Sequence, residues 1–180
     1  DDALVISMAA GVTIDAIKTH FAAPPAIVRI MPNLPLKAGC GMTAICPDEA
    51  VRQADVDALL ALFSSVGRAR LVEERLFDTV TALSGSGPAF AFLFIESMAD
   101  GAVLNGMDRA QAYEFAAQTV MGAAKIILES DRHPGELKDI VASPAGTTMA
   151  GIHSIERKAF RAIVMDAVDA AAARSRELNS

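Results

Sequence analysis

The sequence predicts half of an open α/β sheet in its first part and an all-helical fold in its second part. Up to residue 72, short apolar runs alternate with amphipathic stretches, a pattern typical of strands and helices in turn. From residue 73 onward, one helical pattern follows another. We therefore predict two domains, residues 1–72 and residues 73–180. A hydrophobic fraction of 52% is ample for their cores.

Four short apolar runs have the length of buried strands and cover residues 4–8, 26–30, 39–46 and 68–72. Thr13 is expected to cap a helix to about residue 21. Asp48 is expected to cap a second helix that Gly67 ends. This order of strands and helices is half of an open α/β sheet. No Gly-x-Gly-x-x-Gly follows any strand, so a dinucleotide phosphate loop is expected upstream of residue 1.

Two segments at strand ends could hold a ligand. Ala9-Ala10-Gly11 follows the first strand, and doubly wound sheets bind ligands at the carboxyl ends of their strands. Met31-Pro32-Asn33-Leu34-Pro35 follows the second strand, and its two prolines fix the direction of the asparagine amide. Each segment also has a plain interpretation, as a tightly packed turn or as an ordinary Asn/Pro loop.

The second part contains predicted helices at residues 73–83, 88–104, 108–130, 136–141 and 156–177, with Asp108 as a cap. Between residues 88 and 104 only Glu96, Ser97 and Asp100 are polar. A small bundle cannot bury helices that are apolar on every side, so we expect a homodimer through this half. The many small residues could allow close helix crossings, or they could be ordinary core fillers.

Two Ser/Gly turns, each predicted to open a helix, are the main candidates for a binding site. The first is Ser84-Gly85-Ser86-Gly87 ahead of Pro88, and the second is Ser143-Pro144-Ala145-Gly146-Thr147-Thr148. Exposed amides at helix N-termini attract anions such as a carboxylate, and Thr148 adds a hydroxyl at the rim. The alternative is two well-capped helices. Glu74 is either a polar contact at the junction of the two halves or an ordinary first-turn acid.

Composition and charge argue against several classes of partner. The net charge is −6 and the basic residues are scattered, so neither nucleic acid nor an anionic membrane surface is an expected partner. Apolar runs are interrupted before about 18 residues, so no membrane span is expected. Cys40 and Cys46, placed on one strand roughly 20 Å apart, cannot pair. Such thiols suit the cytoplasm. The three histidines show no metal-ligand spacing, so no metal site is expected.

Five motifs together resemble pyrroline-5-carboxylate reductase over essentially the whole chain. They are Ala9-Ala10-Gly11-Val12, Met31-Pro32-Asn33-Leu34-Pro35, Ala82-Leu83-Ser84-Gly85-Ser86-Gly87-Pro88-Ala89-Phe90, His133-Pro134-Gly135-Glu136-Leu137-Lys138-Asp139 and Ser143-Pro144-Ala145-Gly146-Thr147-Thr148. The resemblance implies an N-terminal Rossmann-type domain that here lacks its first part, and a helical domain that interlocks into a dimer. It also implies further assembly of dimers into rings, such as a decamer.

The implied reaction is the last step of proline biosynthesis, in which NADPH or NADH reduces 1-pyrroline-5-carboxylate to L-proline. By analogy, Met8, Ala9, Ala10 and Asn33 would lie near the nicotinamide end of the cofactor. Thr148 would be the catalytic hydroxyl that bonds the ring nitrogen. The remaining implied substrate contacts are Glu74 at the pocket edge, the segment Ser84, Gly85, Ser86 and Gly87, and the turn residues Gly146 and Thr147.

Two departures from the family pattern affect these expectations. Ala145 stands where the motif usually has glycine, which is tolerable only if its φ is negative. The absent phosphate loop supports the alternative that this chain, which starts at Asp1 and resembles a C-terminal part, is a non-catalytic dimerisation fragment that is expected to be inactive alone. Another Rossmann-type reductase, such as a hydroxy-acid dehydrogenase, usually needs a helix-borne lysine, and none is placed near the predicted pocket.

Overall fold

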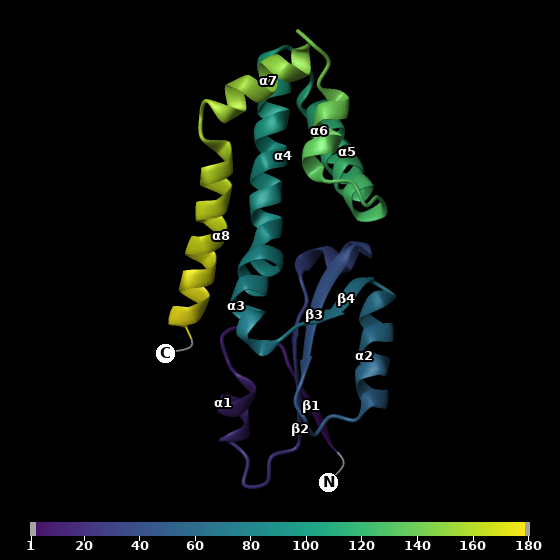
Figure 1. Cartoon of the computed structure of the whole chain (residues 1–180), viewed down its shortest axis with the longest axis vertical. Coiled ribbons are helices and arrows are strands. Elements are labelled where there is room, and N and C mark those ends of the chain that lie inside the picture. Colours follow the sequence, from purple (N-terminus) through teal and green to yellow (C-terminus); the bar gives the residue numbers. More distant parts are fainter. Residues whose placement is uncertain (1–2, 179–180) are drawn as a thin grey trace. The chain divides into compact units, whose positions relative to one another are not determined.

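A four-stranded mixed sheet forms the first part of the chain, with the strands in the order β1-β2-β3-β4. The computed structural model describes residues 3–178, and the strands are β1 (Leu4–Ser7), β2 (Ala26–Met31), β3 (Gly41–Pro47) and β4 (Gly67–Leu71) (Figure 1). β1 pairs with β2 in parallel, β2 with β3 antiparallel and β3 with β4 in parallel. The predicted combination of an α/β half and an all-helical half is confirmed.

Apolar side chains cover both faces of the sheet. On one face Ile27, Met31, Ala44 and Cys46 pack with Phe77. On the other face the core consists of Val28, Ile30, Ile45, Leu59 and Ala69. Burial on both sides explains why β2 and β3 are almost continuously hydrophobic rather than alternating.

The two helices of this part differ from their predicted bounds. Thr13 caps α1 (Ile14–Lys18) as predicted, because its hydroxyl accepts a bond from the Ala16 N–H, but the helix is shorter. Asp48 does not cap α2 (Gln53–Ser64). Its carboxylate instead accepts a bond from the Ala50 N–H and pairs with Lys18, so it shapes a turn before the helix. The prediction of an Asp48 cap is therefore wrong.

Two glycines and a cysteine near β3 also behave differently from the prediction. Gly67 begins β4 and does not end the helix, because α2 ends at Ser64 with Ser65 as its C-cap. Glycine is needed at position 67, since at its φ of 153° a Cβ would lie 2.1 Å from the Gly41 carbonyl oxygen. Cys40 is exposed and precedes β3, so it is not a buried strand residue. Cys46 is buried in β3, and this burial, with the nearby Glu74 charge, raises the pKa of its thiol. Both cysteines are free.

A continuous helical path replaces the first predicted turn. It consists of η2 (Glu74–Leu76), α3 (Phe77–Val80), the π-helical segment η3 (Thr81–Ser86) and α4 (Gly87–Leu104). Among the described residues, Glu74–Leu104 is long and apolar enough to cross a membrane by length and composition alone. The expectation that every apolar stretch is too short is therefore wrong on those two criteria.

The remaining helices are α5 (Arg109–Glu129), α6 (Pro134–Val141), α7 (Thr147–Glu156) and α8 (Phe160–Glu177). Asp108 caps α5 as predicted, by accepting bonds from two helix amides. The predicted final helix from residue 156 is wrong at its start, because α7 ends there and Ala159, at φ 55°, separates α7 from α8. Ala99, Ala112 and Ala116 form a small core between α4 and α5.

The chain divides into two compact units. One unit comprises Asp1–Pro88 and Asp166–Ser180, and the other comprises Ala89–Met165. Within the first unit the C-terminal part of α8 is anchored by Ser175, a buried residue whose hydroxyl donates a 2.6 Å bond to Asp78. The division at residues 72 and 73 follows strand and helix content rather than compactness, and it stays a prediction.

Candidate functional site

The segment Ser84-Gly85-Ser86-Gly87 is helical rather than a turn that opens a helix. In a π-helix each N–H bonds to the carbonyl five residues earlier, so these amides are used inside the helix. Gly87 itself has helical angles, φ −50° and ψ −36°. The prediction of exposed anion-binding amides here is wrong, since no helix N-terminus exists at this position.

Pro88 gives a physical reason for the π-helical segment. Proline has no N–H to offer the carbonyl four residues earlier, and its ring clashes with that carbonyl in a regular α-helix. Here that carbonyl belongs to Ser84, and the wider π-helical turn lies just before the proline. π-helical turns inside α-helices often occur at functional sites.

Asn33 supplies a replacement donor for the Ser84 carbonyl. Its Nδ2 donates to that carbonyl oxygen at 3.1 Å and also lies 3.3 Å from the Ser84 hydroxyl. Its Oδ1 accepts a 2.9 Å bond from the Met42 N–H. The side chain that the sequence placed near a cofactor therefore connects the loop after β2, the start of β3 and the π-helical segment.

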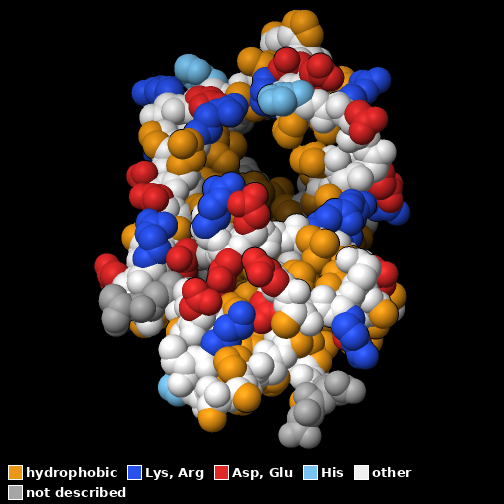
Figure 2. Space-filling model, turned by 60° about the horizontal axis from the view of Figure 1, so that its bottom comes forward, with side chains coloured by type: hydrophobic (Ala, Val, Ile, Leu, Met, Phe, Trp, Pro, Cys, Tyr) orange, Lys and Arg blue, Asp and Glu red, His pale blue; other side chains and the backbone are white. Residues whose placement is uncertain are grey.

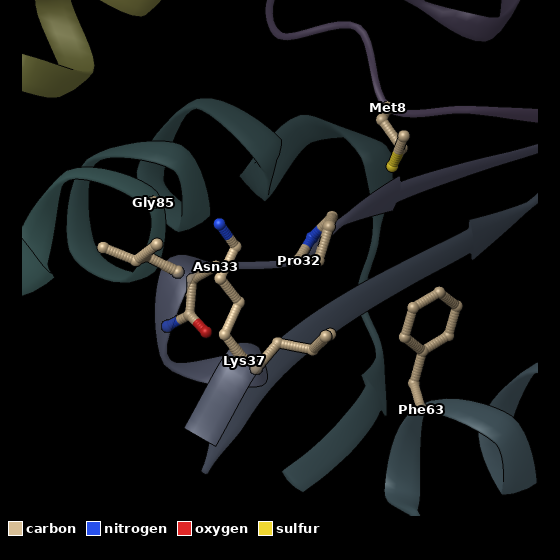
Figure 3. Close-up of a pocket in the computed structure, with 8 residues that line it drawn as sticks. Met8, Pro32, Asn33, Lys37, Phe63 and Gly85 are labelled. Atoms are coloured by element: carbon tan, nitrogen blue, oxygen red, sulfur yellow. The ribbon is translucent and has the colours of Figure 1, made fainter. Parts of the chain in front are cut away.

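A pocket of about 500 Å³ lies beside this connection, at the carboxyl ends of the parallel strands β1 and β2. Its lining residues are mainly apolar: Met8, Pro32, Asn33, Leu34, Leu36, Lys37, Phe63 and Gly85. In Figure 3 Phe63 projects from α2 toward the space that Pro32 and Met8 border, while Asn33 lies between this space and the helix that carries Gly85. An apolar, partly aromatic cavity of this kind suits a flat ring.

Residues 8–10 are exposed just beyond β1. Met8 is 65% exposed and borders the pocket, whereas Ala9 and Ala10 are absent from its lining. The structure thus brings Met8, Asn33 and Gly85 to one cavity.

Glu74 is held in a polar cluster within the first unit. Its Oε1 accepts a 2.6 Å bond from the Ile14 N–H and a 2.7 Å bond from Arg29. The Arg29 side chain is only 4% exposed and its guanidinium lies 4.6 Å from the centre of the Phe77 ring. A buried guanidinium needs a partner, so the carboxylate of Glu74 has a structural task that the sequence did not assign to it.

The second predicted turn is present and opens α7. The Gly146 N–H bonds to the Ser143 carbonyl at 3.0 Å, with Pro144 and Ala145 between them. Proline at the second position and positive φ at the third match a type II turn. Ala145 has φ 57°, so the expectation of a negative φ is wrong, and this alanine adopts a conformation that glycine prefers.

The first turn of α7 offers unpaired donors. Gly146 is its N-cap and provides no side-chain cap, so the first amides of the helix, which include those of Thr147 and Thr148, have no acceptor within it. Thr148 is half-buried, whereas Thr147 is exposed. A Cβ on Gly146 would lie 2.3 Å from the Ser143 Oγ and 3.1 Å from the Ser143 carbonyl oxygen, so a larger residue there would displace Ser143.

The two glycine-bearing segments belong to different compact units. Ser84, Gly85, Ser86 and Gly87 lie in the first unit, and Gly146, Thr147 and Thr148 lie in the second.

Sequence reasoning missed Phe63, Lys37 and the partner of Arg29. Phe63 lies on an apolar helix face, and nothing in helical spacing separates a core side chain from one that lines a pocket. Arg29 carried a usable signal, because a charge inside an apolar strand must find an opposite charge. Glu74 is that charge, 45 residues further along the chain.

Comparison with known proteins identifies relatives of the whole chain. The family described as pyrroline-5-carboxylate reductase dimerisation matches residues 74–178. A pyrroline-5-carboxylate reductase of Methanosarcina acetivorans is 53% identical over 175 residues, which cover 97% of this chain and 65% of that protein. The Escherichia coli enzyme of the same name is 46% identical over 178 residues, or 99% of this chain and 66% of the relative. The chain thus spans just under two thirds of the length of these relatives.

Solved structures agree with this result. A Plasmodium falciparum pyrroline carboxylate reductase with NADP bound superposes with a TM-score of 0.91 at 35% identity, covering 98% of this chain and 71% of that one. A pyrroline-5-carboxylate reductase of Coxiella burnetii gives a TM-score of 0.93 at 34% identity, and the match covers 100% of this chain and 67% of that chain.

Proposed function

Because the chain belongs to the pyrroline-5-carboxylate reductase family, we propose that it functions in an NAD(P)H-dependent oxidoreductase that reduces 1-pyrroline-5-carboxylate to L-proline. The family match over residues 74–178 and the identity of 53% to a reductase of that name support the proposal. The comparisons do not favour the alternative of a non-catalytic dimerisation fragment.

The observation that carries the proposal is the uncapped first turn of α7. The amides of Thr147 and Thr148, which have no acceptor in the helix, are suited to the carboxylate of the substrate, because the positive end of a helix dipole favours an anion. Gly146, whose own N–H bonds to the Ser143 carbonyl, is a proposed contact beside them. The half-buried Thr148 hydroxyl is proposed to bond the ring nitrogen. The proposed contacts with the carboxylate and the ring nitrogen are therefore a helix N-terminus and a hydroxyl, and they include no strong acid.

A helix N-terminus and a hydroxyl suit the chemistry of a cyclic imine. The imine nitrogen is basic, so the protein needs to orient the substrate rather than protonate it with a strong acid. Orientation holds the reacting carbon within roughly 3–3.5 Å of the hydride donor. Fixed donors and a dry pocket are sufficient for this task. Glu74 and the segment Ser84, Gly85, Ser86 and Gly87 remain proposed contacts. In this segment the polar contacts would come from the Ser84 and Ser86 hydroxyls and not from free amides.

The pocket beside β1 and β2 fits the nicotinamide end of NADPH or NADH. Met8, Phe63 and Pro32 offer apolar surface to a flat ring, at the strand ends where doubly wound sheets bind cofactors. When bound, the cofactor supplies the hydride for the imine carbon. Ala9 and Ala10 complete the proposed contacts, and Asn33 lies nearby in the pocket wall. The NADP in the Plasmodium falciparum structure supports this class of cofactor.

We also propose a homodimer formed through the helical half. Helices α4, α5 and α8 leave large apolar side chains exposed, among them Phe92, Leu93, Phe115, Met121, Ile163 and Met165. Figure 2 shows hydrophobic side chains on the outer surface of the molecule. The name of the matching family supports a second copy as their cover, in preference to a membrane. Assembly into a ring or decamer, and a cytoplasmic location consistent with two free thiols, complete the proposal.

An assay with 1-pyrroline-5-carboxylate tests the function. Adding this substrate to the protein with NADPH should consume the absorbance of the reduced nicotinamide. No consumption with NADPH or with NADH would contradict the proposal. Calorimetric titration with NADPH then identifies a non-catalytic fragment, since such a chain would show neither binding nor turnover.

A further inference from the structure

Pro88 cannot donate a main-chain hydrogen bond within the long helix. In an α-helix the Ser84 carbonyl would accept a bond from residue 88, but Pro88 has no N–H. A carbonyl that is partly shielded from water and left without a donor destabilises the fold. The Asn33 amide, which comes from a loop 51 residues earlier, donates to this carbonyl at 3.1 Å.

The chemistry of its neighbours fixes the orientation of the Asn33 amide. The Met42 N–H can only donate, so the atom 2.9 Å from it must be the amide oxygen. The Ser84 carbonyl can only accept, so the atom that faces it must be the amide nitrogen. Both ends of the side chain are therefore committed to partners in the protein.

We infer that Asn33 is a positioning residue, which replaces the amide missing at Pro88 and so fixes the wall of the pocket that Gly85 forms. Gly85 directly follows the braced Ser84, and both Asn33 and Gly85 line the 500 Å³ cavity. A shift of the Ser84 carbonyl would carry Gly85 with it. The nature of the ligand in this cavity rests on the proposed function, whereas the hydrogen bond from Asn33 to the Ser84 carbonyl (the brace) does not.

A mutational cycle tests the brace directly. Asn33→Asp keeps an acceptor for the Met42 N–H and removes both donors to Ser84. Pro88→Ala restores a main-chain N–H that can bond the Ser84 carbonyl. The experiment compares Asn33→Asp in the native chain with Asn33→Asp in the Pro88→Ala background. Asn105→Asp is the matched control, because the Asn105 side chain also donates to a helix carbonyl, that of Gly101 at 2.8 Å, and does not line the pocket.

Hydrogen exchange and NADPH titration are the two measurements. In the native background Asn33→Asp should accelerate exchange of amides in residues 81–90 and raise the NADPH dissociation constant about tenfold, which corresponds to about 1.4 kcal/mol. The KM for NADPH should rise likewise. In the Pro88→Ala background the same substitution should change the NADPH constant less than about threefold, since about one hydrogen bond is recovered. Asn105→Asp should leave all these values unchanged.

Two results would overturn the inference. One is unchanged exchange in residues 81–90 after Asn33→Asp, and the other is an equal loss of NADPH affinity in both backgrounds. If the unaltered protein neither binds NADPH nor turns over substrate, the proposed function fails, and the exchange data alone then decide the role of Asn33.

Discussion

Two segments with nearly the same composition adopt opposite backbones. Residues 84–88 combine serine, glycine and proline inside an unbroken helix, through a π-helical turn. Residues 143–148 combine the same residue types in a type II turn that ends one helical path and opens α7. The first segment uses its amides internally, and the second leaves amides free for a ligand.

The position of the proline explains the difference. Pro144 comes before the glycine, and a proline disfavours helical angles in the residue that precedes it. The chain has already left the helix at Ala142, with φ −97° and ψ 81°. Pro88 comes after the glycines, and Gly87 stays helical because it has no Cβ to clash with the proline ring. Composition thus predicts a special backbone, while residue order decides which kind.

Hydrogen exchange should separate the two segments most strongly. Amides of residues 84–87 should exchange at least about 100-fold more slowly than those of Thr147 and Thr148, because only the former have acceptors inside a helix. Mass-spectrometric or NMR exchange of the unliganded protein measures this ratio. Similar rates in both segments would mean that the Ser84 region frays and behaves as the turn that the sequence first indicated.

Removing the Thr148 hydroxyl should have the next largest effect. For Thr148→Ala we expect kcat/KM to fall by about 1.5–3 kcal/mol of transition-state stabilisation, the range for a hydrogen bond to a charged group. Steady-state kinetics with 1-pyrroline-5-carboxylate measures the loss. Thr148→Ser retains the hydroxyl and should recover most of the activity. An unchanged rate for Thr148→Ala would remove this residue from the site.

Local signals in the sequence predicted much of the fold. The caps at Thr13 and Asp108 depend on residues two or three positions away, so the sequence displays them directly. The hydrogen bond from Asn33 to the π-helical segment joins residues far apart in the sequence, and no local pattern encodes that contact. The pocket wall at Phe63 was likewise hidden, because it needs the sheet and α2 to be placed against each other.

Substitution of Gly146 should destabilise the second segment. In Gly146→Ala the new Cβ would lie 2.3 Å from the Ser143 Oγ and 3.1 Å from the Ser143 carbonyl oxygen. We expect a loss of about 1–3 kcal/mol in the free energy of unfolding, measured by chemical denaturation. Gly151→Ala in the same helix has open space around it and should be neutral or stabilising.

Adding Ser143→Ala to the Gly146→Ala variant removes the contact with the Ser143 Oγ but leaves the contact with the carbonyl oxygen of residue 143. It should therefore restore only part of the stability lost in Gly146→Ala. Full stability in Gly146→Ala alone would show that the turn is loose enough to shift, and that it does not hold the first amides of α7 in place.

Ala145→Gly should have the smallest effect and the opposite sign. The left-handed conformation at φ 57° destabilises a residue with a Cβ by about 1–2 kcal/mol, whereas glycine adopts it freely. Glycine also gains freedom in the unfolded chain, so the net increase in unfolding free energy should be about 0.5–1 kcal/mol. Thermal unfolding measures this gain.

Ala159→Gly is the matched control, because Ala159 has φ 55° and lies outside the turn. Both variants should be stabilised, but only Ala145→Gly can alter the amides that precede α7, so only it should change the KM for 1-pyrroline-5-carboxylate. A destabilised Ala145→Gly would mean that the alanine is not strained in this turn. Equal KM values in the two variants would mean that the turn does not touch the substrate, and the contrast between the two glycine-bearing segments would then concern the backbone alone.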